Sequence, residues 1–263
     1  MVNKSFALIT GASSGIGKEI SKILFNMGYN LLITSRNQNE LLKLKKELNV
    51  LDRDRKIEVV ISNLSTQDGA NIIFQYTKAN NINVEVLVNN AGAGIYGEIT
   101  NLECQEIINM LMLNIYSLTC LSSLYAKEMK LKKAGYILNI GSLAAYQPVP
   151  YIAPYAASKS YVLNFSEAIA MELKEYGVTV SCVSPGHTNT NFFNNANISD
   201  NHKFYGMDTR VDAYKVAKYA VNSLFSKKLS RVYGMKNKFL SLLNKITPRI
   251  LIAHISKYLV SAY

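Results

Sequence analysis

Short apolar runs alternate with stretches of helical periodicity over most of this chain, and no other feature constrains its fold as much. The apolar runs lie at 6–10, 30–34, 57–61, 84–88, 136–140 and 178–183. Runs of this length without polar alternation are typical of strands buried on both faces, as in parallel sheets. Apolar residues recur at helical spacing between them, so the sequence predicts a doubly wound α/β sheet with helices on both faces.

The length and composition fit this fold class. With 263 residues, 49% of them hydrophobic, the chain suits one α/β domain, and we expect a single domain over 1–263. Cys104, Cys120 and Cys182 are too far apart for metal or redox spacing, so we predict no metal site. No secretory segment or uninterrupted apolar run of about 18 residues is visible, which favours a cytoplasmic protein or one peripheral to a membrane.

A glycine-rich turn follows the first predicted strand. The stretch TGASSGIG places Gly11, Gly15 and Gly17 in the spacing G-x-x-x-G-x-G, just before a predicted helix. Glycines let the backbone approach a pyrophosphate closely, and the helix N-terminus offers free N–H groups to it. The alternative is an ordinary tight turn, but the position after the first strand of a β-α-β series favours dinucleotide binding.

The end of the second predicted strand bears on the choice between NAD and NADP. An acidic residue there binds the ribose 2′-hydroxyl of NAD, whereas a basic residue accommodates the 2′-phosphate of NADP. The stretch ITSRNQNE holds Arg36 and no carboxylate before Glu40. A guanidinium binds a phosphate with two hydrogen bonds. We therefore expect NADP(H) rather than NAD(H), the alternative being that Arg36 is an ordinary solvated loop residue.

A tyrosine and a lysine lie four residues apart in the stretch YIAPYAASKSYV. On a helix, Tyr155 and Lys159 share a face, whereas Tyr161 points elsewhere and Tyr151 lies beyond Pro154. A nearby ammonium group favours the phenolate, so we expect the pKa of Tyr155 to fall by about 1–3 units. Tyr155 would then exchange a proton with a substrate oxygen near neutral pH.

Six motifs in this order resemble the short-chain dehydrogenase/reductase family, over residues 5 to about 225. They are TGASSGIG, NNAG at 89–92, Asn114, Ser142, the pair Tyr155 and Lys159, and PGHTNT at 185–190. The chain looks most like a poorly defined bacterial branch, which also resembles NADPH-using 17-beta-hydroxysteroid and 3-ketoacyl reductases. The resemblance implies a Rossmann-type fold and hydride transfer between a nicotinamide cofactor and a carbonyl/alcohol pair. We also expect a homo-oligomer, either a dimer or a tetramer.

The resemblance also implies residue roles. Tyr155 would be the general acid or base and Lys159 would tune it. Ser142 would donate a hydrogen bond to the carbonyl oxygen, and Asn114 would hold a water that resupplies the proton. Asn63 stands where the family usually has an aspartate that meets the adenine amine, and an asparagine oxygen still accepts that bond. The implied cofactor-binding residues are Gly11, Ser13, Ser14, Gly15, Ile16, Gly17, Arg36, Asn63, Leu64, Asn90, Ala91, Gly92, Tyr155, Lys159, Pro185, Gly186, Thr188 and Thr190.

Residues 187–210 fall where the family places its substrate loop. The aromatic residues of this asparagine-rich stretch are Phe192, Phe193, Phe204 and Tyr205. They either cover a hydrophobic substrate or only anchor the loop. His187 and His202 match no metal-ligand spacing, and we predict that both are non-catalytic.

The net charge of +11 arises almost wholly in the C-terminal part of the chain. Of the 29 lysines and arginines, ten follow Asp212, the last acidic residue, which leaves 19 basic against 18 acidic groups in 1–212. Residues 235–263 combine basic residues with apolar residues at helical spacing, which predicts extra amphipathic helices. Four arrangements are open: contact with an anionic membrane, packing on a sister subunit, closure of the substrate cleft, or ordinary packing with a solvated basic face.

The sequence therefore predicts an NADP(H)-dependent oxidoreductase for a hydrophobic carbonyl or alcohol. Two alternatives belong to other classes. One is a regulator that binds a nicotinamide cofactor without turnover, which the presence of both Tyr155 and Lys159 disfavours. The other is a nucleic-acid- or membrane-binding protein that uses the basic tail; no recognised nucleic-acid motif accompanies the charge, so we expect no nucleic-acid partner.

Overall fold

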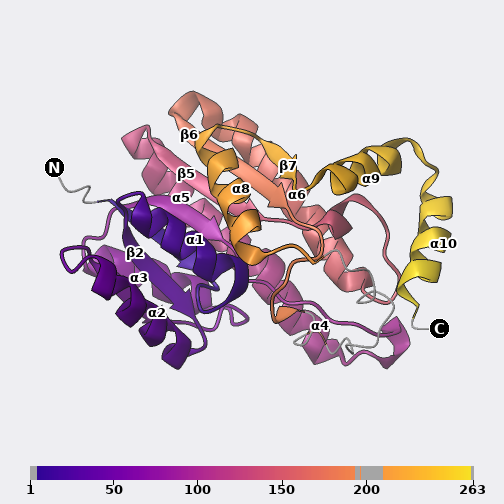
Figure 1. The fold of residues 1–263 in the computed structure, drawn as a ribbon, viewed down its shortest axis with the longest axis horizontal. Coiled ribbons are helices and arrows are strands. Elements are labelled where there is room, and N and C mark those ends of the chain that lie inside the picture. The colour runs from indigo at the N-terminus through magenta and orange to yellow at the C-terminus, as the bar shows by residue number, and fades with distance from the viewer. Residues whose placement is uncertain (1–4, 193–195, 197–209, 262–263) are drawn as a thin grey trace.

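A computed structural model describes residues 5–192, 196 and 210–261. These residues contain one seven-stranded parallel sheet, ordered β3-β2-β1-β4-β5-β6-β7 (Figure 1). The strands are β1 (Phe6–Thr10), β2 (Asn30–Ser35), β3 (Ile57–Ile61), β4 (Val84–Asn89), β5 (Gly135–Ile140), β6 (Val178–Ser184) and β7 (Ser230–Val232). The chain order reverses between β1 and β4, and that point of a doubly wound sheet is where a crevice opens for a ligand.

Helices cover both faces of the sheet, as expected. They are α1 (Gly15–Asn26), α2 (Gln38–Leu51), α3 (Gly69–Ala79), α4 (Cys104–Leu111), α5 (Ser117–Lys132), α6 (Ala153–Leu173), α8 (Ala213–Phe225), α9 (Met235–Ile246) and α10 (Arg249–Val260). One core cluster joins one face of the sheet to α1, α2 and α8, and a second joins the other face to α3, α5 and α6. Residues of β1 alternate between the two clusters and all are buried, which explains the uninterrupted apolar runs.

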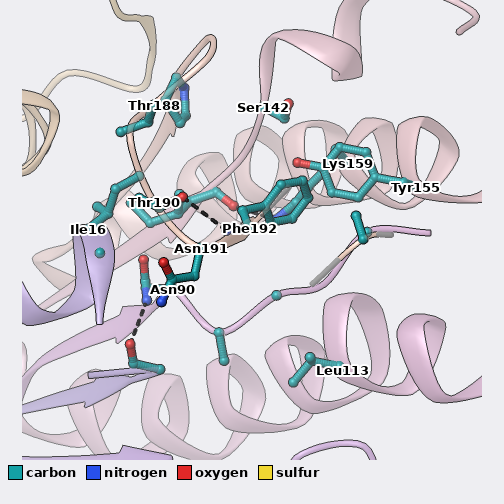
Figure 2. Close-up of a pocket in the computed structure, with 18 of the residues that line it drawn as sticks. Ile16, Asn90, Leu113, Ser142, Tyr155, Lys159, Thr188, Thr190, Asn191 and Phe192 are labelled. Atoms are coloured by element: carbon teal, nitrogen blue, oxygen red, sulfur yellow. Dashed lines mark hydrogen bonds between the residues drawn. The ribbon is translucent and has the colours of Figure 1, made fainter. Parts of the chain in front are cut away.

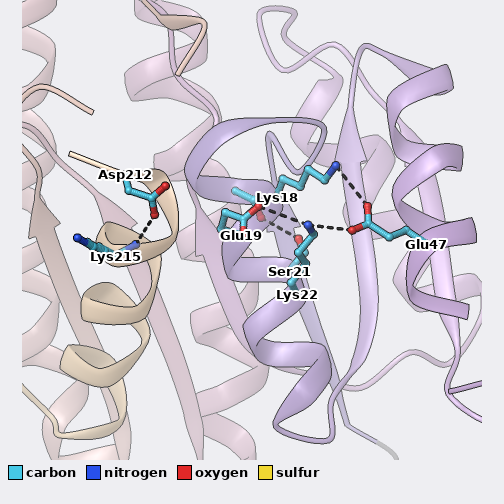
Figure 3. Close-up of polar contacts among 8 residues, drawn as sticks. Lys18, Glu19, Ser21, Lys22, Glu47, Asp212 and Lys215 are labelled. Atoms are coloured by element: carbon cyan, nitrogen blue, oxygen red, sulfur yellow. Dashed lines mark hydrogen bonds and ion pairs between the residues drawn. The ribbon is translucent and has the colours of Figure 1, made fainter. Parts of the chain in front are cut away.

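Ion pairs connect α1 with α2, and a side-chain hydrogen bond caps the N-terminus of α8 (Figure 3). Glu47 of α2 lies 3.3 Å from the ammonium of Lys18 and 2.9 Å from that of Lys22, both on α1. The hydrogen bond from Lys22 lowers the pKa of Glu47, but a pair as exposed as this one stabilises the fold by less than about 1 kcal/mol. Asp212 caps α8, because its carboxylate accepts a hydrogen bond from the backbone N–H of Lys215 at 3.2 Å.

Residues 102–133, which the sequence places between the fourth and fifth apolar runs at helical spacing, do not form one regular helix. A π-helical turn, Met112–Tyr116, separates α4 from α5. Residues Cys104–Lys132 are long and apolar enough to cross a membrane by length and composition alone. Leu121, Tyr125 and Met129 of α5 are buried in the core cluster beneath the sheet, which is typical of the core helix of a globular domain. Asn114 lies on the π turn.

The two extra C-terminal helices are present and lie beyond β7, at one end of the molecule (Figure 1). The end of α10 returns to the body of the protein, where Val260 packs in a small cluster with Val149 and Ala156. The hydroxyl of Tyr96 donates a hydrogen bond to the Val260 carbonyl at 3.3 Å. The last turn of α10 is therefore fixed to loops that follow β4 and β5.

Candidate active site

A cleft of about 1200 Å³ runs along the carboxyl ends of the strands. Loops that follow β1 to β6 line it, and the end of α10 contributes Ser256, Leu259 and Val260. Of the residues that the sequence singled out for catalysis or cofactor binding, all line this cleft except Gly17 and Asn114. The fold thus brings together, from loops at the carboxyl ends of the strands and from α6, the residues that the motifs predict.

The glycine turn has the geometry that close approach of an anion requires. Gly11 and Gly15 have φ angles of +65° and +53°. A Cβ atom at Gly15 would lie 2.8 Å from the Thr190 side chain, and one at Gly11 would lie 2.9 Å from the amide nitrogen of Asn90. Helix α1 begins at Gly15, and the Ser14 side chain does not cap it, so the first N–H groups of α1 face the cleft without a side-chain acceptor.

Gly17 has a different role from the other two glycines. It does not line the cleft, and a Cβ atom there would lie 2.4 Å from both the Gly11 carbonyl oxygen and the amide nitrogen of Asn90. Gly17 is therefore the position at which α1 packs directly against the turn and against the loop after β4.

The loop after β4 is fixed to the glycine turn by hydrogen bonds (Figure 2). The side-chain amide of Asn90 donates to the carbonyl oxygens of Thr10 and Gly11 at 3.0 and 3.2 Å. The Thr10 hydroxyl accepts from the backbone N–H groups of Asn90 and Ala91, both at 3.0 Å. These hydrogen bonds fix the glycine turn after β1 and the loop after β4 to each other, where both line the cleft.

Tyr155 and Lys159 share a face of α6, as predicted, and both are buried. The Lys159 ammonium lies 5.9 Å from the centroid of the Tyr155 ring and donates a hydrogen bond to the Ile140 carbonyl at 2.9 Å. Burial lowers the pKa of Lys159 to about 8. The Lys159 side chain therefore connects the end of β5 with the tyrosine.

The expected fall in the pKa of Tyr155 is wrong for the protein without bound ligands. Burial raises the pKa of Tyr155 to about 12, and only the hydrogen bond with Ser142 acts in the opposite direction. Desolvation determines the direction because the Tyr155 side chain is only 9% exposed, so little water reaches the phenol to stabilise its charged form. At neutral pH the tyrosine is consequently a neutral phenol, and its partner lysine is mostly an ammonium.

Ser142 lies two residues after the end of β5, and its hydroxyl is a hydrogen-bond partner of the Tyr155 hydroxyl. Its oxygen also accepts a hydrogen bond from the backbone N–H of Ala144 at 3.2 Å, at the start of the short 3₁₀ helix Leu143–Tyr146. That bond orients the serine toward Tyr155. The two hydroxyls thus converge on one point in the cleft.

Asn114 lies beneath the cleft rather than in its wall. Its side-chain oxygen accepts from the Ala93 N–H at 2.9 Å, and its nitrogen donates to the Ala93 carbonyl and to the Ser158 hydroxyl at 2.9 and 3.0 Å. A Cβ atom at Gly92 would lie 3.3 Å from the Asn114 oxygen and 3.4 Å from the Lys159 nitrogen. Asn114 therefore fixes the loop that passes over Lys159, and the π turn places it there.

The adenosine end of the cleft is more open. Arg36 is exposed at the end of β2, and Asn63, at the end of β3, uses its side-chain oxygen to accept the Ser65 N–H at 3.1 Å. Glu40 also lines this end, from the first turn of α2. Arg36 thus lies where the sequence placed it, and its guanidinium faces solvent at the rim of the cleft.

The opposite end of the cleft is apolar. Phe192 lies beside Tyr155, with ring centroids 5.2 Å apart, and packs against Gly94 (Figure 2). Thr190 accepts a hydrogen bond from the Phe192 N–H at 3.3 Å. The other apolar wall residues are Ile95, Tyr96, Leu113, Val149, Ile152, Ala196, Leu259 and Val260. The aromatic residues Phe193, Phe204 and Tyr205, and His202, lie outside the described residues.

Two further observations concern groups that the sequence set aside. His187 lines the cleft, and burial, with Arg210 nearby, lowers the pKa of its side chain. Within residues 5–192, 196 and 210–261, no three His, Cys, Asp or Glu side chains lie close enough to hold a metal ion. The contribution of α10 to the wall agrees with one of the arrangements left open for the tail, a helix at the substrate cleft, although apolar spacing alone did not say which residues would meet it.

A protein-family model described as short chain dehydrogenase matches residues 5–203. The chain belongs to the short-chain dehydrogenase/reductase family. Its members are oxidoreductases that act on CH–OH or keto groups, and the chain is accordingly an oxidoreductase whose Rossmann-type fold binds a nicotinamide cofactor. The family takes small-molecule substrates and its members often form oligomers.

Individual members of the short-chain dehydrogenase/reductase family resemble the chain over different lengths. A "probable short-chain type dehydrogenase/reductase", VdlC of Helicobacter pylori, is 29% identical over 98% of this chain and 91% of its own. A 3-ketodihydrosphingosine reductase of Bacteroides thetaiotaomicron is 32% identical over 73% of this chain and 67% of its own. A very-long-chain 3-oxoacyl-CoA reductase of Kluyveromyces lactis is 34% identical over 68% of this chain, a match that spans about half, 54%, of that reductase.

Solved structures share the fold of this chain. A short-chain dehydrogenase from Sphingobium yanoikuyae, solved in complex with NADPH, superposes with a TM-score of 0.82 over 92% of this chain and 93% of that one, at 23% identity. A 7beta-hydroxysteroid dehydrogenase superposes with a TM-score of 0.85 over 96% of both chains, at 21% identity.

Proposed function

We propose that the protein is an NADP(H)-dependent reductase or dehydrogenase for a hydrophobic carbonyl/alcohol pair, with Tyr155 as the general acid and base. The observation that carries this proposal is the convergence of the Ser142 and Tyr155 hydroxyls, with the Lys159 ammonium behind the tyrosine ring. They lie between the apolar end of the cleft and the glycine turn. A proton donor, a hydrogen-bond donor and a cation at one point are what carbonyl reduction needs from a protein.

The residues present fit a dinucleotide. The N–H groups at the start of α1 would hold its pyrophosphate, and the glycines at 11 and 15 leave room for the phosphates, because a Cβ atom at either position would meet a neighbour. The loop after β4 and residues Pro185, Gly186, Thr188 and Thr190 would lie along its nicotinamide half. When bound, the nicotinamide supplies or accepts the hydride.

Residues of the chain itself would donate the proton and stabilise the charge that its transfer leaves. In reduction, the Tyr155 hydroxyl transfers its proton to the substrate oxygen as that oxygen gains negative charge, while the Ser142 hydroxyl donates a hydrogen bond to the same oxygen. The Lys159 ammonium stabilises the phenolate that forms. Solvent then returns a proton to Tyr155, and we propose that Asn114 helps by holding the backbone beside Lys159. At neutral pH Tyr155 is a neutral phenol and so holds the proton that carbonyl reduction requires.

The preference for NADP(H) rests on Arg36. Its guanidinium stands at the end of β2 at the rim of the cleft, where it would contact a 2′-phosphate. The neighbour from Sphingobium yanoikuyae was solved with NADPH, which supports the same choice. Glu40 is four residues further on, and its carboxylate opposes a phosphate less than one at position 36 would.

The substrate class follows from the apolar end of the cleft and from the relatives. Phe192, Tyr96 and Ile152 form a wall that favours a hydrocarbon chain or ring system. The relatives from Kluyveromyces lactis and Bacteroides thetaiotaomicron are named for 3-oxoacyl and 3-keto lipid substrates. We therefore propose a lipophilic 3-oxo compound, used in the cytoplasm or at a membrane surface by a homo-oligomer.

A chain-length series tests the proposal. Oxidation of NADPH is followed with 3-oxoacyl thioesters of increasing length, and kcat/KM should rise with length until the apolar end is filled. Tyr155→Phe is the matched control, since it keeps the ring and removes only the hydroxyl. NADPH binding without turnover of any ketone in the series would favour the cofactor-binding regulator instead.

A further inference from the structure

Helix α9 is oriented with its polar side toward the protein. Asn237, Ser241 and Asn244, spaced at about one helical turn, face inward. The Asn237 side chain donates to the Tyr233 carbonyl at 2.8 Å, the Asn244 side chain donates to the Gln147 side chain at 2.5 Å, and Ser241 is buried. An ordinary surface helix buries its apolar side, so this arrangement is the reverse of the usual one.

The outward side of α9 is consequently apolar. Phe239, Leu242 and Ile246 point away from the protein, and Phe239 and Ile246 are 66% and 77% exposed. Helix α10 continues the pattern, because Ile252, Ser256 and Val260 are buried while Leu251, Ile255 and Tyr258 are exposed. We call the exposed residues Phe239, Leu242, Ile246, Leu251, Ile255 and Tyr258 the tail face. Figure 1 shows both helices at the outer edge of the molecule, and among the described residues the side chains of the tail face are exposed.

Basic side chains border the tail face. Lys236, Lys245, Arg249 and Lys257 are all exposed, and helical geometry puts Lys236 and Lys245 on opposite flanks of the apolar stripe of α9. None of the ion pairs among the described residues involves these four. The sequence supplies no acidic residue after Asp212 to neutralise them.

The charge of the basic border distinguishes between two partners for the tail face, a second copy of this chain and an anionic lipid surface. A second copy of this chain, docked face to face through a two-fold axis, would bring the same lysines and arginines of both tails together without an acidic partner. Like charges at an interface disfavour association. An anionic lipid surface instead offers headgroups to the basic border and acyl chains to the apolar stripe.

We propose that the tail face docks on the surface of an anionic lipid bilayer, with α9 and α10 lying in the headgroup region. The docking is independent of the proposed function. It has one consequence for that function if both hold: Leu259 and Val260 line the apolar end of the cleft from the same helix that carries Leu251 and Tyr258 on its outer side. The membrane would then adjoin the substrate end of the cleft.

Vesicle sedimentation of the full-length protein tests the proposal. The probes are vesicles of phosphatidylcholine alone and of phosphatidylcholine with phosphatidylglycerol, without substrate or cofactor. We expect sedimentation with the anionic vesicles only, and its loss at high salt, because screening acts over about 10 Å at 0.1 M ionic strength. Since each basic residue near an anionic surface strengthens binding about fivefold, the four substitutions of K236Q/K245Q/R249Q/K257Q should together weaken binding about 600-fold.

A second variant tests the apolar stripe. F239S/I246S/Y258S changes exposed residues that do not line the cleft, so it should fold and keep its reductase activity on a water-soluble ketone while losing vesicle binding. The matched control is V50S/L51S, which removes two equally exposed apolar residues at the end of α2, and it should bind vesicles normally. Equal sedimentation with neutral and anionic vesicles, or unchanged binding by the tail variant, would overturn the proposal. So would a dimer in light scattering that the tail variant dissociates, with no vesicle binding by either protein.

Discussion

Replacing Lys159 with methionine tests how the buried ammonium serves Tyr155. The charge lies 5.9 Å from the centre of the tyrosine ring. At an effective dielectric constant of about 20, a unit charge at that distance stabilises a phenolate by about 3 kcal/mol. The transition state for proton transfer carries much of that charge, so Lys159→Met should reduce kcat for ketone reduction by about a hundredfold, the rate equivalent of that energy.

The pH profile of the reduction separates this role from a structural one. The pKa of Lys159 is lowered to about 8 because burial disfavours the ammonium, so the lysine is charged below that pH and neutral above it. The native protein should therefore lose reductase activity as the pH rises through about 8. Lys159→Met should be slow throughout and lack that descending limb, as measured by NADPH oxidation under saturating substrate. A native-like kcat at pH 7 in the variant would refute the reasoning.

Four other variants probe the cleft and its surroundings. Tyr155→Phe should keep NADPH affinity and lose about 10² to 10⁴ in turnover, whereas Tyr151→Phe, outside the cleft, should change turnover by less than about threefold. Arg36→Ala should weaken NADPH binding about tenfold and leave NADH binding nearly unchanged, measured by fluorescence titration; tighter NADH binding by the native protein would contradict the assignment. Gly17→Ala should lower stability by about 1–3 kcal/mol in denaturant titration, because its Cβ would lie 2.4 Å from a backbone oxygen; native stability would show that α1 shifts freely.

Most strands of the sheet could be predicted from the sequence because a buried parallel strand has a recognisable pattern. Burial on both faces makes each strand an uninterrupted apolar run, and six strands begin and end within one residue of the predicted bounds. The seventh strand, β7, is only Ser230–Val232 and contains an exposed arginine, so it lacks such a run. It forms because β6 offers it a free edge, which is a tertiary effect that the local sequence does not record.

The candidate site could be located from the motifs, but its electrostatics could not. Helical spacing was enough to place Lys159 beside Tyr155, yet it gave the wrong direction for the tyrosine pKa. The pKa depends on how much water reaches the phenol, and Phe192 from a distant loop contributes to excluding it. The π turn that carries Asn114 was equally hidden, since its residues continue the helical pattern of α4 and α5.

For residues 235–263, the apolar spacing predicts amphipathic helices but not the direction in which their apolar sides face. The apolar spacing of Phe239, Leu242 and Ile246 predicted a helix face correctly, but a hydrophobic face has the same periodicity whether it points inward or outward. What selects the direction is the opposite face, where the Asn244 side chain hydrogen-bonds that of Gln147, and the Asn237 side chain packs against Gly186 while it donates to the Tyr233 carbonyl just before the helix. An amphipathic helix whose polar side faces the protein, and whose exposed apolar side is bordered by lysines that form no ion pair among the described residues, complements the anionic and apolar surface of a lipid bilayer.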